Sequence, residues 1–180
     1  AFNDELTGLA SRAHFYQHLN ELLKRSFRFG QRFGVLYIDL DDFKDINDSL
    51  GHDTGDLLLK TIANRLKDTC READYIARLS GDEFCILVEE ANDDYAANVA
   101  QRCLDAISQP LELGARKISP TCSIGITHYP DDGDDATSLL KAADTSLYAA
   151  KEDGKDRYAF YTRELTEQAE YRFQFEQSLR

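Results

Sequence analysis

Residues 74–89 read DYIARLSGDEFCILVE, and this stretch decides the fold class. Both halves carry β-branched and aromatic residues, while the SGD at 80–82 has the composition of a tight turn. We therefore predict a hairpin with strands at 74–79 and 83–89. The second strand contains the run CILV at 85–88. Continuous apolarity is typical of a strand with neighbours on both sides, so this strand should be central.

Outside the hairpin, helical and strand patterns alternate along the chain. The first helix has apolar residues at helical spacing from Phe15 to Phe27, and Ser11 can cap its start. Alternating helices and strands indicate an α/β or α+β class, with helices packed on a mixed sheet. The other predicted elements are a helix at 12–28, a strand at 33–40, a short helix from Phe43 ended by Gly51, helices at 55–69, 93–108 and 136–152, a short hairpin at 111–119, a strand at 121–128 and a last strand near 158–161.

The net charge of the chain limits the classes of binding partner that we expect. The 180 residues include 21 Lys and Arg against 33 Asp and Glu, which gives a formal net charge of −12. Nucleic-acid backbones and anionic membranes need a positive face, so neither is expected as the main partner. A nucleotide is not excluded, because a metal ion and a few local cations can hold a polyphosphate on an acidic protein.

The length of the chain indicates one domain with room for a short additional arm. The sequence has no apolar run of transmembrane length and no secretory signal pattern. It lacks an initiator Met, so we expect a piece of a longer protein, without direct membrane insertion in this segment. Cys70, Cys85, Cys103 and Cys122 form no CxxC pair, which predicts reduced packing residues rather than zinc ligands or disulfides.

Acidic residues follow two of the predicted strands. Asp39 ends the first strand and precedes Asp41 and Asp42, while Asp82 and Glu83 lie at the hairpin tip. If the two strands are neighbours, these carboxylates converge. Two hard oxygen ligands then hold Mg²⁺, with room for water and phosphate oxygens. Taken singly, each group is also explained by a solvated acidic turn or a plain β-turn.

The segment FKDINDSLGHDTGD and a later helix end offer groups for a nucleotide. Lys44 lies near a helix start, where amides and a cation can hold phosphate. Asp56 can accept from the N1–H and amino group of guanine, and the Asn47 amide can meet its O6 and N7. The alternative is that Asn47 and Asp56 are helix caps. Lys151 and Lys155 are by composition solvated lysines favoured by the helix dipole.

Together these pieces resemble one family signature. The chain is similar to the GGDEF family, the diguanylate cyclases, over nearly all of residues 4–160. Agreement across five ordered segments is far more specific than any single motif. The matching pieces are DELTGL at 4–9 with Arg12; DLD at 39–41 followed by FK at 43–44 and IND at 46–48; GH at 51–52 with GD at 55–56; Arg78 before SGDEF at 80–84; and AD at 143–144 with LY at 147–148, AK at 150–151 and Gly154.

The resemblance implies a fold and an activity. The expected α/β (α+β) fold is similar to the palm of nucleotidyl cyclases and polymerases, with a central, mostly antiparallel sheet flanked by helices. Family members condense two GTP molecules into cyclic di-GMP and release two pyrophosphates. Each protomer of a homodimer holds one GTP, and the 3′-hydroxyl of one GTP attacks the α-phosphate of the other. Such a reaction depends mainly on positioning and charge neutralisation.

The resemblance also implies a role for each matched residue. Asp39 and Asp82 bind Mg²⁺ (or Mn²⁺), and the Leu40 carbonyl completes the site. Glu83 either binds the metal or deprotonates the 3′-hydroxyl. Lys44 joins Asp82 and Glu83 among the catalytic residues. The substrate-binding residues are Phe43 and Lys44 for the phosphate loop, Asn47 and Asp56 for guanine, and Lys151 and Lys155 for the β- and γ-phosphates.

A second nucleotide site is implied by READ at 71–74, which matches the inhibitory RxxD motif of the family. The motif ends five residues before the signature, as it does in the family. Arg71 and Asp74 would bind cyclic di-GMP, and Arg102 on the following helix is a third candidate by family position. The alternative is a simple ion pair at a helix end.

Three positions depart from the family pattern. Ser80 replaces the first glycine of the signature, and its side chain could crowd the nucleotide or strain the turn. Lys155 replaces an arginine, which keeps the charge but loses bidentate geometry. Ser11 replaces an asparagine before Arg12. Because of Ser80, the alternative to an active cyclase is a weak or inactive regulatory domain that binds GTP or senses cyclic di-GMP and controls an attached EAL phosphodiesterase.

The composition changes at Thr162. The stretch TRELTEQAEYRFQFEQSLR has no Gly or Pro and is rich in Glu, Gln and Arg, which predicts a helical arm. We expect a GGDEF domain at 1–161 and a helical linker at 162–180, leading toward an EAL domain. The location would be cytoplasmic, either as a cytoplasmic protein or as the cytoplasmic part of a membrane-attached one.

Overall fold

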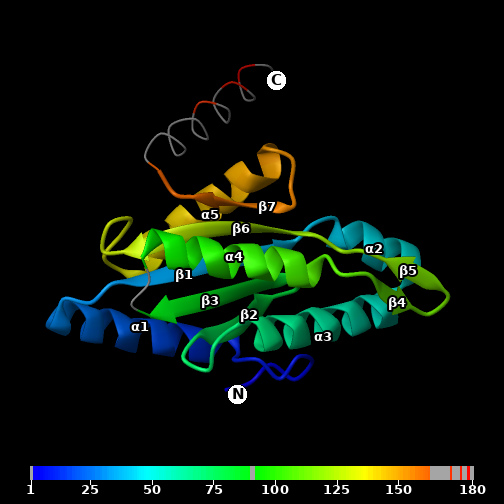
Figure 1. The fold of residues 1–180 in the computed structure, drawn as a ribbon, viewed down its shortest axis with the longest axis horizontal. Coiled ribbons are helices and arrows are strands. Elements are labelled where there is room, and N and C mark those ends of the chain that lie inside the picture. Colours follow the sequence, from blue (N-terminus) through cyan, green and yellow to red (C-terminus); the bar gives the residue numbers. More distant parts are fainter. Residues whose placement is uncertain (1, 90–91, 163–170, 172–174, 176–177, 179–180) are drawn as a thin grey trace.

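Figure 1 shows a computed structural model of the chain, which describes residues 2–89 and 92–162 and the positions 171, 175 and 178. Helices and strands alternate as the sequence predicts. The helices are α1 (Arg12–Phe29), α2 (Phe43–Leu50), α3 (His52–Thr69), α4 (Asp93–Ile107) and α5 (Ala136–Glu152). The strands are β1 (Phe33–Leu40), β2 (Tyr75–Ser80), β3 (Glu83–Glu89), β4 (Leu111–Leu113), β5 (Arg116–Ile118), β6 (Cys122–Tyr129) and β7 (Arg157–Phe160).

The central sheet has five strands in the order β2-β3-β1-β6-β7. β1 pairs antiparallel with both β3 and β6, and β2 pairs antiparallel with β3. β7 runs parallel to β6 at the edge. The sheet is therefore mostly antiparallel, as expected, and β3 lies between two strands, which suits its continuous apolar run. β4 and β5 form the separate short hairpin.

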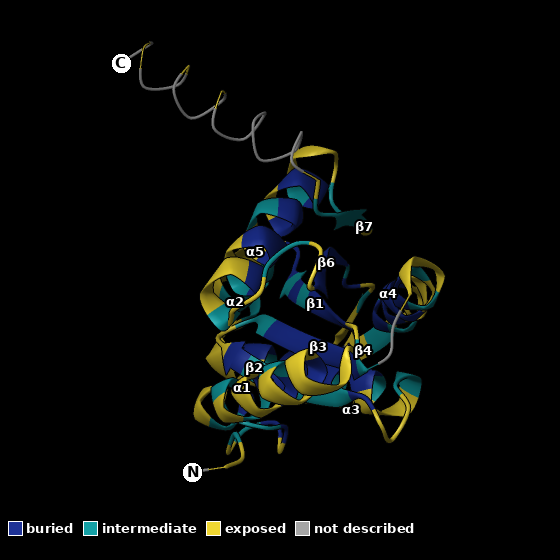
Figure 2. Cartoon of the chain, turned by 90° about the vertical axis from the view of Figure 1, so that its left-hand side faces the viewer, coloured by how far each residue is buried: buried dark blue, intermediate teal, exposed yellow. Residues whose placement is uncertain are grey.

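Helices cover both faces of the sheet. Successive residues of a strand point to opposite faces, so each buried strand contributes apolar side chains to both. Leu36 and Ile38 of β1 pack with α3 and α4 in one buried cluster, whereas Val35 packs with α1 and α5 in the other. Figure 2 shows the strands between these two helix layers, with exposed residues on the outer helix surfaces. Each fully buried aliphatic side chain contributes about 1.5–3 kcal/mol. By the same alternation, Tyr37 and Asp39 project toward α1 and α5.

The buried face of α1 omits one apolar residue of the helical spacing near its end. Phe27 is 83% exposed, whereas Ser26 is 1% exposed. An α-helix turns about 100° per residue, so a residue one step beyond the buried row points well away from it. Phe27 therefore continues the helical spacing of apolar residues without lying on the buried face. The buried row of α1 is Phe15, Leu19, Leu22 and Ser26.

Several element boundaries lie one to three residues from the predicted ones. α3 begins at His52 rather than at 55, directly after Gly51, and β2 covers 75–80 rather than 74–79. All four cysteines are free thiols, as expected, and three of them are buried. The predicted helical arm at 162–180 falls almost entirely outside the described residues. None of the described helices has the length and apolar composition needed to cross a membrane.

Candidate functional site

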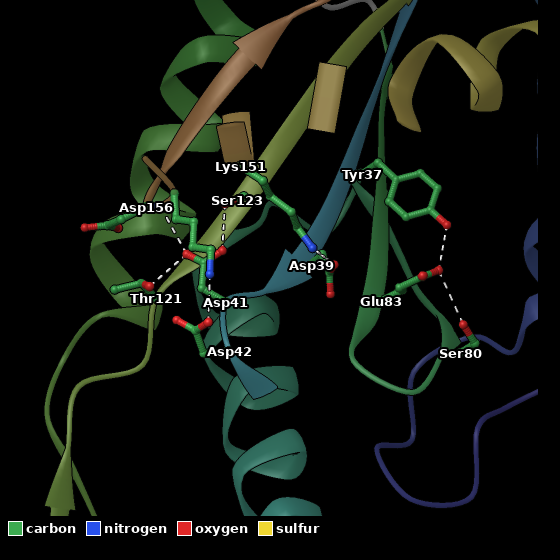
Figure 3. Close-up of polar contacts among 11 residues, drawn as sticks. Tyr37, Asp39, Asp41, Asp42, Ser80, Glu83, Thr121, Ser123, Lys151 and Asp156 are labelled. Carbon is green, nitrogen blue, oxygen red and sulfur yellow. Dashed lines mark hydrogen bonds and ion pairs between the residues drawn. The ribbon is translucent and has the colours of Figure 1, made fainter. Parts of the chain in front are cut away.

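The end of β1 lies between the hairpin tip and β6. The strand register places Asp39 opposite Glu83 on β3 and opposite Ser123 on β6. The Leu40 amide donates to the Asp82 carbonyl at 3.3 Å, which fixes the hairpin tip beside the end of β1. The structure thus brings the acidic residues that follow β1 close to those of the hairpin, as Figure 3 shows for Asp39 and Glu83.

Asp39 and Asp82 form a carboxyl pair. The pKa of Asp82 is raised to about 7, first by burial and then by a hydrogen bond to Asp39 and by the charge of that carboxylate. Lys151 forms an ion pair with Asp39 Oδ2, whereas Asp39 Oδ1 is buried without a hydrogen-bond partner. Two adjacent carboxyls that share one lysine carry an uncompensated acidic charge, which is costly in a partly buried site.

A divalent cation fits this pair. Mg²⁺ and Mn²⁺ prefer carboxylate and carbonyl oxygens and are commonly held by one or two carboxylates together with phosphate oxygens. Asp39 and Asp82 supply the carboxylates, and the Leu40 carbonyl belongs to the same strand end. Within 2–89, 92–162 and the other described positions, no three or more His, Cys, Asp or Glu side chains form a complete metal cluster. The donor set therefore suits a cation that binds together with a nucleotide.

Glu83 accepts hydrogen bonds from two side-chain donors. The Tyr37 hydroxyl donates to Glu83 Oε2 at 2.7 Å, and the Ser80 hydroxyl donates to the same oxygen at 3.3 Å (Figure 3). Burial and this hydrogen bond raise the pKa of Tyr37. On α5, burial and the charge of Glu83 raise the pKa of Asp144. Sequence reasoning gave no role to Tyr37 or Asp144, although the two-residue spacing of Tyr37 and Asp39 along one strand was the available signal.

Ser80 does not strain the hairpin turn. The left-handed backbone conformation lies at Gly81, with a φ of 41°, and Ser80 is not among the residues with positive φ. The strand register shifts between Arg78 and Ser80, so Ser80 sits at an irregularity at the end of β2. The expectation of strain at Ser80 is therefore wrong. Its hydroxyl contacts the signature carboxylate Glu83 instead.

The two residues proposed to bind guanine, Asn47 and Asp56, lie where α2 packs on the first turns of α3. A β-carbon on Gly55 would lie 2.2 Å from Asn47 Oδ1, so a larger residue at this position would displace the Asn47 amide. Asn47 Nδ2 also lies 2.9 Å from His52 Nδ1. Asp56 follows Gly55 directly and is exposed. Asn47 lies inside α2 and Asp56 inside α3, which rules out the alternative that they are N-caps. The N-cap positions belong to Asp42 and Gly51.

Each of the two lysines proposed to bind phosphate pairs with an aspartate at or after the end of β1. Lys151 is in the last turn of α5 and pairs with Asp39. Lys155 pairs with Asp42 at 2.7 Å, and this contact raises the pKa of Lys155. Neither lysine is the merely solvated group that composition suggests. Lys44 is exposed on the first turn of α2, close along the chain to Asp42.

Asp41 has a different environment from Asp39. It is 5% exposed, and its two oxygens accept from the Ser123 hydroxyl at 2.7 Å, the Thr121 hydroxyl at 2.7 Å and the Asp156 amide at 3.0 Å. Sequence reasoning grouped Asp41 with Asp39 because both follow the same strand. The partners that distinguish Asp41 from Asp39 lie 80, 82 and 115 residues away along the chain.

The RxxD residues lie at the far end of α3, beside α4. Arg71 stands over the Tyr95 ring at 4.2 Å and pairs with the buried Asp74 at 3.5 Å. Tyr95 donates to Asp74 Oδ2 at 3.3 Å. The expected alternative, an ion pair at a helix end, is thus present. Arg102 lines a shallow hollow of about 440 Å³ with Asp68, Thr69, Asp105, Ala106 and Gln109.

Comparison with known proteins places the chain in a family. The family profile described as "Diguanylate cyclase, GGDEF domain" matches residues 1–157. Cyclic di-GMP phosphodiesterase NbdA of Pseudomonas aeruginosa is 38% identical over 177 residues, which are 98% of this chain and 23% of that protein. The bifunctional diguanylate cyclase/cyclic di-GMP phosphodiesterase MucR of the same bacterium is 38% identical over 180 residues, 100% of this chain and 26% of that protein. The chain therefore spans about a quarter of the length of these curated relatives.

The structural comparison agrees with the sequence comparison. The solved GGDEF domain of TpbB (YfiN) from Pseudomonas aeruginosa matches with a TM-score of 0.89 and 34% identity, over 93% of this chain and 99% of that chain. Its fold is the mostly antiparallel sheet flanked by helices that is described above. The signature residues, the fold and the comparisons lead to one conclusion: the chain belongs to the GGDEF family.

Proposed function

We propose that the chain is a diguanylate cyclase that condenses two GTP molecules into cyclic di-GMP, with Mg²⁺ or Mn²⁺ as cofactor. The observation that carries this proposal is the Asp39–Asp82 pair, with its raised pKa at Asp82 and its unpartnered buried oxygen at Asp39. Carboxyls perturbed by burial and by a specific charged neighbour are typical of functional sites.

The carboxylates of Asp39 and Asp82, with the Leu40 carbonyl, would hold the cation. When bound, the cation neutralises negative charge on the phosphate oxygens. Lys151 and Lys155 each pair with a carboxylate. They are the groups that can turn toward the β- and γ-phosphates, since a lysine head on a flexible stem exchanges one oxygen partner for another.

Glu83 is the proposed acceptor for the proton of the 3′-hydroxyl, or a further metal ligand. Tyr37 and Ser80 both donate to Oε2, so they orient the carboxylate. Phe43 and Lys44, in the first turn of α2, would line the phosphate loop.

Asn47 and Asp56 would recognise guanine. The Asn47 amide can meet O6 and N7, while Asp56 accepts from N1–H and the 2-amino group. ATP would present an amino group to the Asn47 donor and would leave Asp56 without either donor, because adenine has no N1–H and no 2-amino group. Each mispaired polar group costs about 1–3 kcal/mol, so we expect ATP to fail as a substrate.

The reaction joins two nucleotides, whereas each chain is proposed to hold one. Turnover would therefore need two copies of the chain facing each other, and it should rise with protein concentration or with artificial dimerisation. The proposed division of the chain is a GGDEF domain at 1–161 and a linker at 162–180 toward a phosphodiesterase domain. Relatives that are about four times longer, and are named as phosphodiesterases, support this division.

The direct test is product analysis. The purified chain, concentrated or fused to a dimeric partner, is incubated with GTP and Mg²⁺, and the products are separated by chromatography and weighed by mass spectrometry. We expect cyclic di-GMP and pyrophosphate from GTP and neither product from ATP. If GTP binds but no cyclic di-GMP forms in the dimeric protein, an active cyclase is excluded.

The second candidate is a regulatory domain that binds GTP without turnover. The Ser80 hydroxyl favours it, because a glycine at that position could not donate to Glu83. Comparing turnover of the parent chain with that of Ser80→Gly separates the candidates. Activity that appears only in Ser80→Gly would support the regulatory domain.

Inhibitory binding of cyclic di-GMP is proposed for Arg71, Asp74 and Arg102. The Arg71 guanidinium can present its fork to guanine O6 and N7 or to a phosphate, and Asp74 can accept from the guanine edge. Calorimetric titration with cyclic di-GMP should show binding that Arg71→Ala weakens and that Arg116→Ala, on β5, leaves unchanged. Equal binding by the parent chain and Arg71→Ala would remove the assignment.

A further inference from the structure

We propose that Asp41 is a positioning residue for the nucleotide phosphates. Its buried carboxylate holds the turn between α5 and β7, and this turn keeps Lys151 beside Asp39 and Lys155 beside Asp42. The inference rests on the proposed function, because it concerns how the GTP phosphates meet these lysines.

Asp41 connects three segments that are distant in sequence. Its Oδ1 accepts from the Ser123 hydroxyl at 2.7 Å, in β6. Its Oδ2 accepts from the Thr121 hydroxyl at 2.7 Å and from the Asp156 amide at 3.0 Å (Figure 3). The Asp41 amide in turn donates to the Thr121 carbonyl at 2.9 Å. Asp41 therefore has its oxygens committed to the protein, which distinguishes it from the metal carboxylates.

The turn that Asp41 holds has an unusual backbone. Lys155 and Asp156 have φ angles of 64° and 49°, in the left-handed region that residues with a β-carbon rarely adopt. Two consecutive residues in this region need external support. The support comes from neighbouring acids of one segment: Asp41 accepts the Asp156 amide, and Asp42 pairs with the Lys155 ammonium at 2.7 Å.

This support has a direct consequence for the site. The turn begins at the end of α5, where Lys151 reaches Asp39. The Lys155 backbone also closes onto α5, because its amide donates to the Ala150 carbonyl at 3.1 Å. Without the Asp41 acceptor, the turn is free to relax toward ordinary φ values, and Lys155 then leaves the side of β1. Asp41 touches neither substrate nor metal in this account, and it acts through the turn.

The test compares nucleotides that differ in their phosphates. Binding of the Mg²⁺ complex of a non-reactive α,β-methylene GTP analogue and binding of GMP are measured by calorimetry or NMR for the parent chain and for Asp41→Ala. We expect affinity for the triphosphate to fall about tenfold or more, the scale of one lost charge-assisted hydrogen bond, while affinity for GMP changes little. Asp41→Asn, which keeps one acceptor oxygen, should recover part of the triphosphate affinity.

A merely structural role would not change the ratio of the two affinities. Asp132→Ala is the matched control, because Asp132 accepts the His128 amide at 2.7 Å at the other end of β6. It should leave the ratio unchanged. Asp156→Gly keeps both the amide and a backbone that adopts positive φ, so it should bind the triphosphate like the parent chain. An equal loss in Asp156→Gly would overturn the assignment to the amide.

The outcomes also separate this inference from the proposed function. If the parent chain binds neither nucleotide, the assignment of GTP as substrate fails first. If the parent chain binds the triphosphate and Asp41→Ala binds it equally well, the positioning role of Asp41 fails alone. Should Asp41→Ala not fold, Asp41→Asn carries the test, and an unchanged affinity ratio in that variant would overturn the proposal.

Discussion

Asp39 and Asp41 lie two residues apart after the same strand, yet the protein treats them differently. Asp41 is 5% exposed, and each of its oxygens accepts a hydrogen bond from the chain. Asp39 leaves Oδ1 buried without a hydrogen-bond partner and faces Asp82, whose pKa it helps to raise to about 7. The fold supplies donors to both oxygens of Asp41, whereas Asp39 pairs with Lys151 through Oδ2 only.

The difference lies in the surroundings, because the residue type is the same. A buried carboxylate with several donors stabilises the elements that carry the donors. A carboxylate placed beside a second acid costs free energy, and a bound cation would offset that cost. The contrast therefore separates a structural acid from a ligand-binding acid without reference to the family.

The largest expected effect is on turnover. Asp82→Ala removes one of the two carboxylates of the pair, so the rate of cyclic di-GMP formation should fall at least about a hundredfold. Liquid chromatography of GTP reactions with Mg²⁺ measures the loss. Near-normal turnover in Asp82→Ala would show that the pair is not the metal site.

The two acids should affect stability with opposite signs. Asp41→Ala leaves two hydroxyls and one amide without their acceptor, so we expect it to lower the free energy of unfolding by about 2–4 kcal/mol. Asp82→Asn removes a repelled charge and should leave stability unchanged or raise it at pH 7.5. Urea denaturation in the presence of EDTA measures both. A loss of similar size in both variants would remove the distinction between the acids.

The pH dependence of stability should report the Asp82 carboxyl. Its pKa rises from an ordinary value of 3.8 to about 7, so the folded chain holds this proton more tightly than the unfolded chain. Its contribution is therefore complete below about pH 4 and is lost as the pH rises through 7. In Asp82→Asn, the decrease in the free energy of unfolding with rising pH should be smaller by about 1–2 kcal/mol. This is less than the whole pKa shift of Asp82 would give, because water reaches the half-buried carboxyl. Identical pH profiles of the parent chain and the variant, measured with EDTA, would contradict the raised pKa.

The smallest expected effect concerns Ser80. Ser80→Gly removes the 3.3 Å hydrogen bond to Glu83 but leaves the 2.7 Å bond from Tyr37, so turnover should be kept or rise by no more than a few-fold. Ser80→Ala is the matched control, since it removes the hydroxyl but keeps a β-carbon. If the hydroxyl matters, the alanine and glycine variants behave alike. If the bulk of the side chain matters, the alanine variant behaves like the parent chain.

Much of the fold could be predicted because its signals are local. The alternating and apolar strands, the turn at 80–82 and the central position of β3 follow from neighbouring residues. The exposure of Phe27 was not predictable, because it lies near the end of a helix, where a further apolar residue beside the buried row looks like part of the core. Local spacing does not show which residue of an adjacent pair the sheet covers.

The site was predictable in part for the same reason. The spacing of the acids placed Asp39 and Asp82 at strand ends, and the strand pairing brings them together. The contact partners of Tyr37 and Asp41 were not predictable, although the two-residue spacing of Tyr37 and Asp39 indicates that they share one face of the strand. Tyr37 meets Glu83, 46 residues away, and Asp41 meets Asp156, 115 residues away, through strand register and a tertiary turn. No pattern within one element encodes these contacts.

Binding of Mn²⁺ tests the central claim most directly. Electron paramagnetic resonance counts bound Mn²⁺ in the chain saturated with the non-reactive GTP analogue, for the parent chain, Asp82→Ala and Asp41→Ala. We expect strong Mn²⁺ binding in the parent chain, its loss in Asp82→Ala, and its retention in Asp41→Ala once the nucleotide is raised to saturation. Unchanged Mn²⁺ binding in Asp82→Ala, or equal loss in both variants, would contradict the division between a ligand-binding acid pair and a structural acid.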